Sequence, residues 1–163
     1  MRDNKWLWIT VGCLISWGII IFWIVCVVTA HGAAPEDQAV SHEELEEEAY
    51  YDSLELLAVC VEAEAGNQDL DGKRMVVDVI LNRVEHPDWP DTIMDVITQP
   101  YEFSSYWDGG MDQVWEPSEE TFKAVQMELE KRSWPGLYYF TSNGFSVYGT
   151  PWKKAGDHYF STE

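Results

Sequence analysis

The stretch "DSLELLAVCVEAEAG", Asp52–Gly66, holds the pattern from which the rest of the fold can be built. Its apolar residues recur every three or four positions, as they do on the buried face of an amphipathic helix. Asp52 followed by Glu55 is typical of a helix start, and Gly66 is typical of a helix end. The stretch therefore predicts a helix from Asp52 to Ala65, with one face in the core and one face in water.

Two glutamates near the end of this helix face in different directions. Because successive helical residues are rotated by about 100°, Glu62 lies over Glu55 on the polar face, whereas Glu64 lies over Leu57 on the apolar face. We expect Glu62 to be an ordinary solvated carboxylate that is not needed for function. A half-buried carboxyl group near a helix C-terminus favours its neutral form, which a general acid requires. Glu64 is therefore the candidate catalytic residue, unless it turns outward at a fraying helix end.

The segment "DGKRMVVDVILNRVEHPDWPDTIMDVITQPYEFSSYWDG", from 71 to 109, adds a set of short motifs in a fixed order. In chain order the motifs are Glu-Ala at 64–65, Gly72, "LNRV" at 81–84, "QPYEFS" at 99–104, "LYYF" at 137–140 and "GDHYF" at 156–160. Through them, the chain from Leu54 to Phe160 resembles the cell-wall hydrolase family that includes the spore cortex-lytic enzymes of the SleB/CwlJ type. Each motif alone is weak evidence, but all of them in this order are a specific signal.

The resemblance implies that the catalytic residue is the glutamate of a Glu-Ala pair. Ungapped spacing from Gly72 and Asn82 selects Glu64 over Glu62, in agreement with the helical-face argument. We expect substrate-binding residues in and beside the matched motifs, namely Asn82, Gln99, Tyr101, Glu102, Phe103, Ser104, Tyr106 and Trp107. For Asn82, a buried structural role is an equal alternative. The chain departs from the family pattern at Gln68, where an acid is usual, and at Glu102, where a glutamine is usual.

Aromatic side chains are frequent around "QPYEFS", and sugar rings stack their C–H faces on aromatic rings. Tyr101, Tyr106 and Trp107 are therefore candidates for the wall of a glycan-binding groove, with packing inside the lobe as the alternative. His158 could orient another side chain, although packing is the favoured interpretation. Cys60, the one cysteine outside the apolar N-terminal segment, is expected to be a small core residue.

The remaining patterns predict an α+β fold. Helical periodicity continues at 70–84, in a short segment 92–98 capped by Asp91, and at 118–131, where Phe122, Val125 and Leu129 form the inner stripe. Beyond Pro135, alternation predicts strands in "LYYFTS" at 137–142, "FSVYG" at 145–149 and "HYFS" at 158–161. The predicted fold is a helical lobe with a small antiparallel sheet, and the resemblance makes this lobe similar to lysozymes and lytic transglycosylases.

The N-terminal segment differs in composition from the rest. Residues 6–30 contain no charged side chain, and a helix of that length spans about 37 Å, enough to cross a bilayer. Since basic residues precede this segment and acidic residues follow it, we expect 1–5 in the cytoplasm, a single transmembrane anchor at 6–30, an acidic linker at 31–50 and an extracytoplasmic catalytic domain at 51–163. Cleavage after Ala30, which would release the protein, is the alternative.

The charge of the chain excludes some partners. A formal net charge of −19 argues against nucleic acid, because phosphate binding requires lysine and arginine. Three cysteines and four histidines, spread along the chain, do not suggest a metal site, so a zinc amidase is a remote alternative and no cofactor is expected. The expected partners are peptidoglycan and the membrane, and no protein partner can be named.

The leading hypothesis is a lytic transglycosylase that cleaves MurNAc–GlcNAc bonds, with Glu64 as the single general acid/base. A hydrolytic muramidase needs a second carboxylate, for which Glu102 and Asp108 are the candidates. A third hypothesis is a membrane-tethered glycan-binding protein without activity, in which Gln68 marks a decayed site.

Overall fold

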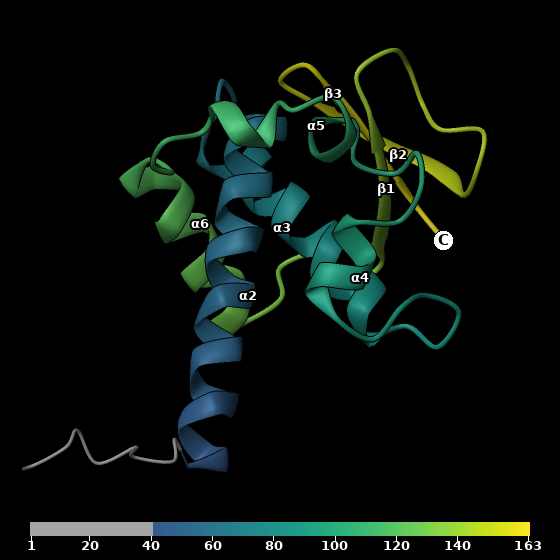
Figure 1. Ribbon diagram of the computed structural model, residues 1–163. Coiled ribbons are helices and arrows are strands. Elements are labelled where there is room, and N and C mark those ends of the chain that lie inside the picture. Colours follow the sequence, from purple (N-terminus) through teal and green to yellow (C-terminus); the bar gives the residue numbers. More distant parts are fainter. Residues whose placement is uncertain (1–40) are drawn as a thin grey trace, which may run out of the picture. The chain divides into compact units, whose positions relative to one another are not determined.

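The structure, a computed structural model, describes residues 41–163 and combines a helical lobe with a small sheet (Figure 1). Its elements are α2 (His42–Ala65), α3 (Leu70–Glu85), α4 (Ile93–Ile97), α5 (Ser104–Trp107), the 3-10 helix η1 (Met111–Gln113), α6 (Glu119–Glu130), β1 (Leu137–Thr141), β2 (Thr150–Ala155) and β3 (His158–Thr162). The predicted α+β architecture is confirmed. The predicted transmembrane segment lies outside the described residues, and within 41–163 no helix has the length and hydropathy needed to cross a bilayer.

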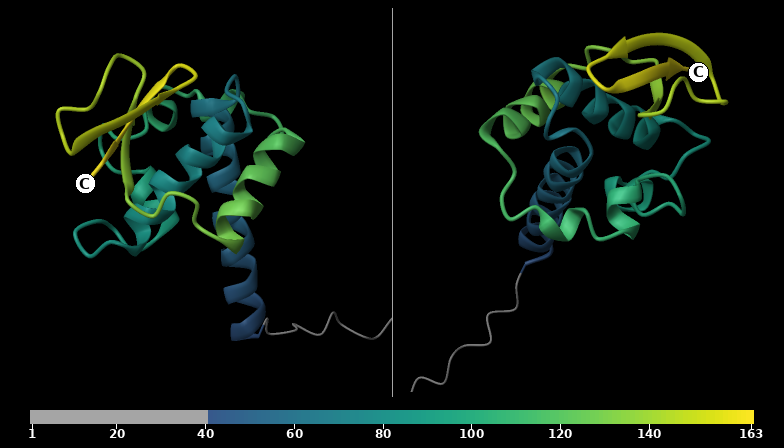
Figure 2. Two further views of the ribbon diagram at one scale, coloured as in Figure 1. Left: turned by 180° about the vertical axis from the view of Figure 1, so that it is seen from behind. Right: turned by 90° about the horizontal axis from the view of Figure 1, so that it is seen from above.

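Helix α3, which the periodicity at 70–84 predicted, is the scaffold of the lobe. It contacts α2, α4, α6 and β1, and Figure 2 shows the fold from two further sides. Eleven of its residues are buried, among them Met75, Val76 and Ile80. The Asp69 side chain caps its first turn by accepting the N–H of Gly72 at 2.9 Å. This buried helix fixes where α2 and β1 can lie, and those two elements carry the candidate site.

Helix α2 begins at His42, so the prediction of a start at Asp52 was wrong. The preceding residues 42–51 include five glutamates, which favour helix, and the helix therefore continues upstream without a core to support it. Residues 42–52 are all exposed, and these outer turns project beyond the lobe (Figure 1). Burial begins only at Leu57, and the predicted domain boundary between residues 50 and 51 falls inside the helix.

Two shorter helices differ from prediction in detail. Thr92, not Asp91, caps α4, because its hydroxyl accepts the N–H of Asp95 at 3.1 Å. In α6 the buried face is rotated from the predicted stripe, and Phe122 is 46% exposed. The buried residues of α6 are Thr121, Ala124, Val125 and Glu128. Polar side chains occupy this interface because partners on other elements bind them, which hydrophobic periodicity does not detect.

The sheet has the order β1-β3-β2, and both pairs are antiparallel. The strands predicted from "LYYFTS" and "HYFS" are confirmed, with Phe140 paired to Phe160. The strand predicted from "FSVYG" was wrong, because residues 145–149 lie in the connection before β2. This connection is bounded by Gly144 and Gly149, whose φ values of 116° and 72° interrupt an extended strand, and Val147 is 91% exposed.

Candidate active site

Glu64 lies in the last turn of α2, where its carboxylate is half-buried. Its Oε1 accepts two hydrogen bonds from Ser105, one from the backbone N–H at 3.2 Å and one from Oγ at 2.6 Å. Ser105 is the second residue of α5 and is 7% exposed, so it holds the carboxylate in a fixed position. Within residues 41–163 no hydrogen bond to Oε2 is found, which leaves that oxygen without a protein partner.

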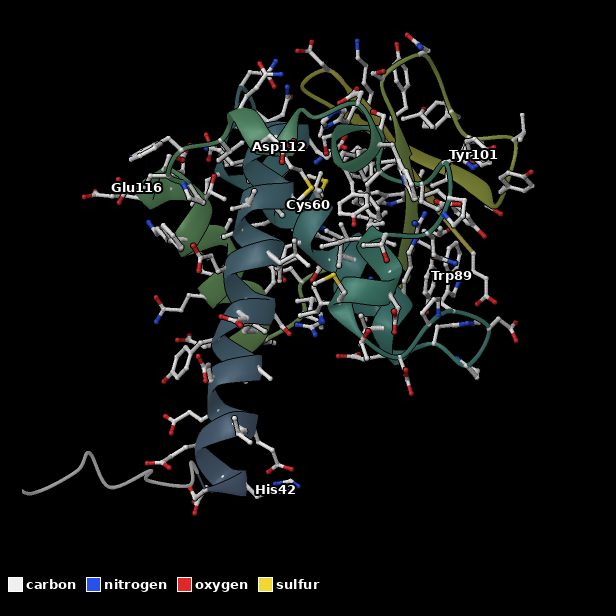
Figure 3. The ribbon with its side chains drawn as sticks, in the orientation of Figure 1. His42, Cys60, Trp89, Tyr101, Asp112 and Glu116 are labelled. Carbon is white, nitrogen blue, oxygen red and sulfur yellow. The ribbon has the colours of Figure 1, made fainter. Side chains whose placement is uncertain are left out.

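The charge of Glu64 affects the pKa values of two other ionisable groups, Cys60 and His158. Burial, and then the charge of Glu64, raises the pKa of the Cys60 thiol well above its usual value. Burial lowers the pKa of His158, although the charges of Glu64 and Asp157 oppose this shift. Both groups therefore favour their neutral forms. Cys60 is a buried free cysteine inside the helical lobe, as predicted (Figure 3).

Glu62 is not the solvated residue that the helical-face argument predicted. Its Oε2 accepts hydrogen bonds from the backbone N–H and Oγ of Ser118, at 3.1 and 2.9 Å, and from Oγ1 of Thr121, and Lys73 Nζ lies 3.9 Å away. Burial raises the pKa of Glu62, but these hydrogen bonds and the Lys73 charge outweigh it, so the pKa is lowered. Glu62 therefore ties α2 to the start of α6. Glu62 does lie on the predicted polar face of α2, but the first turn of α6 covers this part of the face.

Three of the predicted substrate-binding residues have structural contacts. Asn82 is 3% exposed and donates its amide hydrogens to the carbonyl groups of Trp134 and Leu137, at 2.8 and 2.9 Å. Asn82 therefore has the structural role that was the alternative, and its side chain is not open to a glycan. Phe103 is 1% exposed, so it too is inaccessible to a polymer. Gln99 is half-buried, and its backbone carbonyl accepts the indole N–H of Trp107 at 3.2 Å.

Two surface grooves share the side chain of Tyr101. We call them the α5 groove, of about 430 Å³, and the loop groove, of about 460 Å³. The α5 groove is lined by Pro100, Tyr101, Ser104, Trp107 and Asp108. The loop groove is lined by Arg83, Tyr101, Glu102, residues 139–141 and residues 143–148. Glu64 lines neither groove, but its partner Ser105 follows Ser104 of the first, and its neighbour His158 packs on Phe140 of the second.

The three aromatic candidates are on the surface. Tyr101 is 98% exposed, and Tyr106 and Trp107 are 40% and 57% exposed and meet edge to face at 5.2 Å. This exposure argues against the alternative that they pack inside the lobe. Tyr101 also has a φ of 72°, a left-handed conformation that is unusual for a residue with a side chain. Strained residues of this kind concentrate at functional sites.

Both candidates for a second carboxylate are bound to other groups. Glu102 Oε2 lies 2.8 Å from Nη1 of Arg83, which is 4% exposed and stacks on Trp89 with its guanidinium carbon 4.1 Å from the ring centre. Asp108 Oδ1 accepts the backbone N–H of Gly110 at 2.9 Å. In the described part of the chain, no three His, Cys, Asp or Glu side chains are placed to hold a metal ion.

Sequence reasoning missed two parts of this site. Ser105 directly follows the matched "QPYEFS" motif, so its position was a usable signal, but only Ser104 was selected. The connection from Asn143 to Tyr148 was predicted in part as a strand, although it lines the loop groove. Its aromatic residues between two glycines were the available signal.

Comparison with known proteins gives related sequences and folds. The chain matches the model of the family described as Cell Wall Hydrolase over residues 67–161. It is 33% identical over 114 residues to the spore cortex-lytic enzyme of Oceanobacillus iheyensis, and 32% identical over 113 residues to that of Bacillus subtilis. Each match covers 66% of this chain but only 40% and 36% of those relatives, so the chain spans about two fifths of their length.

Two solved structures resemble the fold. The catalytic domain of the Bacillus cereus SleB protein matches with a TM-score of 0.60 and 27% identity, covering 69% of this chain and 91% of that domain. The catalytic domain of the germination-specific lytic transglycosylase SleB from Bacillus anthracis matches with a TM-score of 0.59 and 24% identity, covering 77% and 98%. The second similarity concerns the fold alone.

Proposed function

Since the chain belongs to the cell wall hydrolase family, as the order of its motifs predicted, we propose that it cleaves the glycan strands of peptidoglycan as a lytic transglycosylase. The observation that carries this proposal is the setting of Glu64. One carboxylate oxygen is fixed by Ser105, the other has no protein partner in residues 41–163, and the Glu102 carboxylate is paired with Arg83. This arrangement supports a reaction that needs one acid/base residue.

The proposed reaction has two proton transfers, both at Glu64. In the first, Glu64 gives its proton to the oxygen that bridges MurNAc and GlcNAc, the bond from C1 of MurNAc to that oxygen breaks, and C1 gains oxocarbenium character. In the second, the C6 hydroxyl of the same MurNAc gives its proton to the Glu64 carboxylate while its oxygen bonds to C1. The products are a free GlcNAc hydroxyl and a 1,6-anhydro-MurNAc end, and Glu64 recovers its proton. The substrate supplies the nucleophile, so no second carboxylate is required.

Product analysis tests the reaction type. Purified full-length protein is incubated with sacculi, with Glu64→Gln as the matched inactive control, and the released fragments are analysed by mass spectrometry. We expect anhydro-MurNAc ends, lighter by one water than reducing ends. Reducing MurNAc ends would instead identify a hydrolytic muramidase, and Glu102→Gln would then be expected to lose as much activity as Glu64→Gln. Binding to sacculi without released fragments would identify the non-catalytic glycan-binding protein.

Replacing Tyr101 by glycine should increase the stability of the protein but weaken its binding to glycan. The Tyr101 side chain is 98% exposed and contributes no packing, while its φ of 72° suits glycine. We expect Tyr101→Gly to raise the free energy of unfolding by about 1 kcal/mol. The same change should weaken binding to glycan strands roughly threefold to tenfold, because a stacking surface is lost. Denaturant unfolding and sedimentation with sacculi measure the two effects.

Trp115 provides the control for Tyr101. It is also an exposed aromatic residue, at 97%, but lines a different groove with Tyr51 and Phe122. We expect Trp115→Ala to leave glycan binding unchanged. Equal weakening by both substitutions would remove Tyr101 as a specific contact.

The proposal includes a location outside the cytoplasmic membrane. Peptidoglycan lies there, and residues 6–30 with the basic residues before them fit a single anchor with a cytoplasmic N-terminus. The catalytic domain would then act on the wall while attached to the membrane, or be secreted if the chain is cleaved after Ala30.

A further inference from the structure

The loop after α2 and the turn between β2 and β3 are joined through Gln68, which is 7% exposed. Gln68 Oε1 accepts the backbone N–H of Asp157 at 2.9 Å, and Gln68 Nε2 donates to Oδ2 of the same residue at 3.2 Å. Asn67 Nδ2 donates to that Oδ2 as well, at 3.3 Å. Gly156 makes this approach possible, because a Cβ at its position would collide with Gln68 Oε1. One buried amide therefore binds both the backbone and the side chain of Asp157.

The chemistry of residue 68 matches that of residue 157. An amide has an acceptor end and a donor end, and Gln68 uses one on an N–H and the other on a carboxylate. An ionised glutamate at position 68 could still accept the N–H, but it would place a second negative charge against Asp157 with no proton to donate. Glutamine at this position is thus required by its partner, which argues against Gln68 as the mark of a decayed site.

The residues next to this pair belong to the candidate active site. Gln68 lies four residues after Glu64, just beyond the end of α2, and Asp157 directly precedes His158, the first residue of β3. His158 is 7% exposed and packs on Phe140 with ring centres 5.2 Å apart. Its Nδ1 is buried and has no hydrogen-bond partner among the described residues. Packing therefore holds the ring from the sides, while the position of its backbone depends on the turn that Gln68 binds.

We propose that Gln68 and Asp157 form a clamp that holds the start of β3, with His158, against the end of the helix that carries Glu64, which makes Gln68 a positioning residue for the proposed glycan cleavage. The inference rests on the proposed function for its kinetic consequence, but the clamp itself is a structural claim. If the clamp fails, β3 can move relative to the end of α2, and the surroundings of Glu64 change without any change in Glu64 itself.

An exchange of acid and amide tests the clamp. Gln68→Glu should lower kcat on solubilised glycan strands about 10- to 100-fold at pH 7.5 with KM changed less than about twofold, since misplaced catalytic groups cost that much. The double variant Gln68→Glu/Asp157→Asn restores the acceptor and donor pairing in reverse and keeps the wild-type charge. We expect it to recover kcat to within about threefold of wild type. Asp157→Asn alone keeps an acceptor at position 157, so its kcat should fall less than that of Gln68→Glu.

The pH profile separates the clamp from a general loss of stability. A protonated glutamate at position 68 has a donor and an acceptor, like glutamine, so the Gln68→Glu variant should regain activity relative to wild type as the pH is lowered. If kcat fell equally in Gln68→Glu and in Gln68→Glu/Asp157→Asn at every pH, the clamp would be overturned.

A readout without activity keeps the two proposals distinguishable. The ¹⁵N signals of the His158 imidazole, identified among the four histidines with His158→Gln, report its surroundings directly. We expect Gln68→Glu to move the His158 titration to higher pH and the double variant to move it back. Unchanged signals would overturn the clamp even if wild type cleaves glycan. If wild type cleaves no glycan, the proposed function fails, and these signals still decide the clamp.

Discussion

We expect the replacement of Glu64 by glutamine to lower the proposed rate of glycan cleavage by about 10²- to 10⁴-fold, the contribution typical of a positioned acid–base group. Glutamine has the same size, and its Oε1 can accept the two hydrogen bonds from Ser105, so the site keeps its geometry. What is lost is the proton that the leaving oxygen must receive and the carboxylate that must take one back. The rate is measured as fragments released from sacculi per unit of protein.

Glu55 supplies the control for this substitution. It lies on the same helix, is exposed, and loses the same charge in Glu55→Gln. We expect this variant to cleave glycan at the wild-type rate. Glu64→Gln with more than about half of wild-type activity would remove Glu64 from its role, because no general acid of this kind contributes so little.

We expect Asp78 to stabilise the fold less as the pH rises toward neutrality, because two carboxyl groups are buried together between α3 and α6. Asp78 and Glu128 are both 0% exposed, and Asp78 Oδ2 accepts the N–H of Trp134 at 2.7 Å. Burial, the hydrogen bond that protonated Asp78 donates to Glu128, and the charge of Glu128 together raise the pKa of Asp78 to about 7. The other charged groups at this interface are Arg74, which lies 2.6 Å from Glu128, and Arg132, which opposes the shift.

The direction of this pH dependence follows from the protons that the folded and unfolded states bind at Asp78. The pKa of an aspartate in the unfolded chain is about 3.9, so between about pH 4 and pH 7 the folded state holds a proton that the unfolded state has lost. The contribution of Asp78 to the free energy of unfolding therefore decreases through this window and is flat above it, whereas His158, whose pKa is lowered, contributes in the opposite direction below its ordinary value of 6.5. From pH 5 to pH 8 we expect wild type to lose about 1–3 kcal/mol relative to Asp78→Asn, measured by denaturant unfolding of both proteins at each pH. Glu62, with its lowered pKa, acts in the opposite direction only below its ordinary value of 4.5.

Asp78→Asn should remove most of this pH dependence. The amide keeps an oxygen for the N–H of Trp134 and a donor for Glu128, but it does not titrate. Asp71→Asn is the matched control, since Asp71 also lies on α3 near Arg74 but is exposed. An Asp78→Asn variant with the same slope as wild type would contradict the assignment.

Much of the fold could be predicted because single elements carry their own pattern. Helix α3 and strands β1 and β3 have apolar patterns of their own within one segment, so their sequences were sufficient. Glu64 was selected for a similar reason, since a helical face is a local property. The "FSVYG" segment alternates like a strand, yet its flanking glycines adopt positive φ and no core lies against it.

The contacts that were missed all join distant parts of the chain. Ser118 and Thr121 bind Glu62 from more than fifty positions away, and Ser105 binds Glu64 across forty-one. A pattern in one segment assigns a face to a side chain but does not say which other segment covers that face. For the same reason, Gln68 appeared as an unexplained departure until Asp157 was seen beside it.

The exposed outer turns of α2 set the distance between the first residue of this helix and the candidate acid. From His42 to Glu64 the helix rises about 33 Å at 1.5 Å per residue, and only its last turns are packed in the lobe (Figure 3). A helical turn inserted among residues 42–52 would therefore lengthen this distance by about 5.4 Å without disturbing a buried contact.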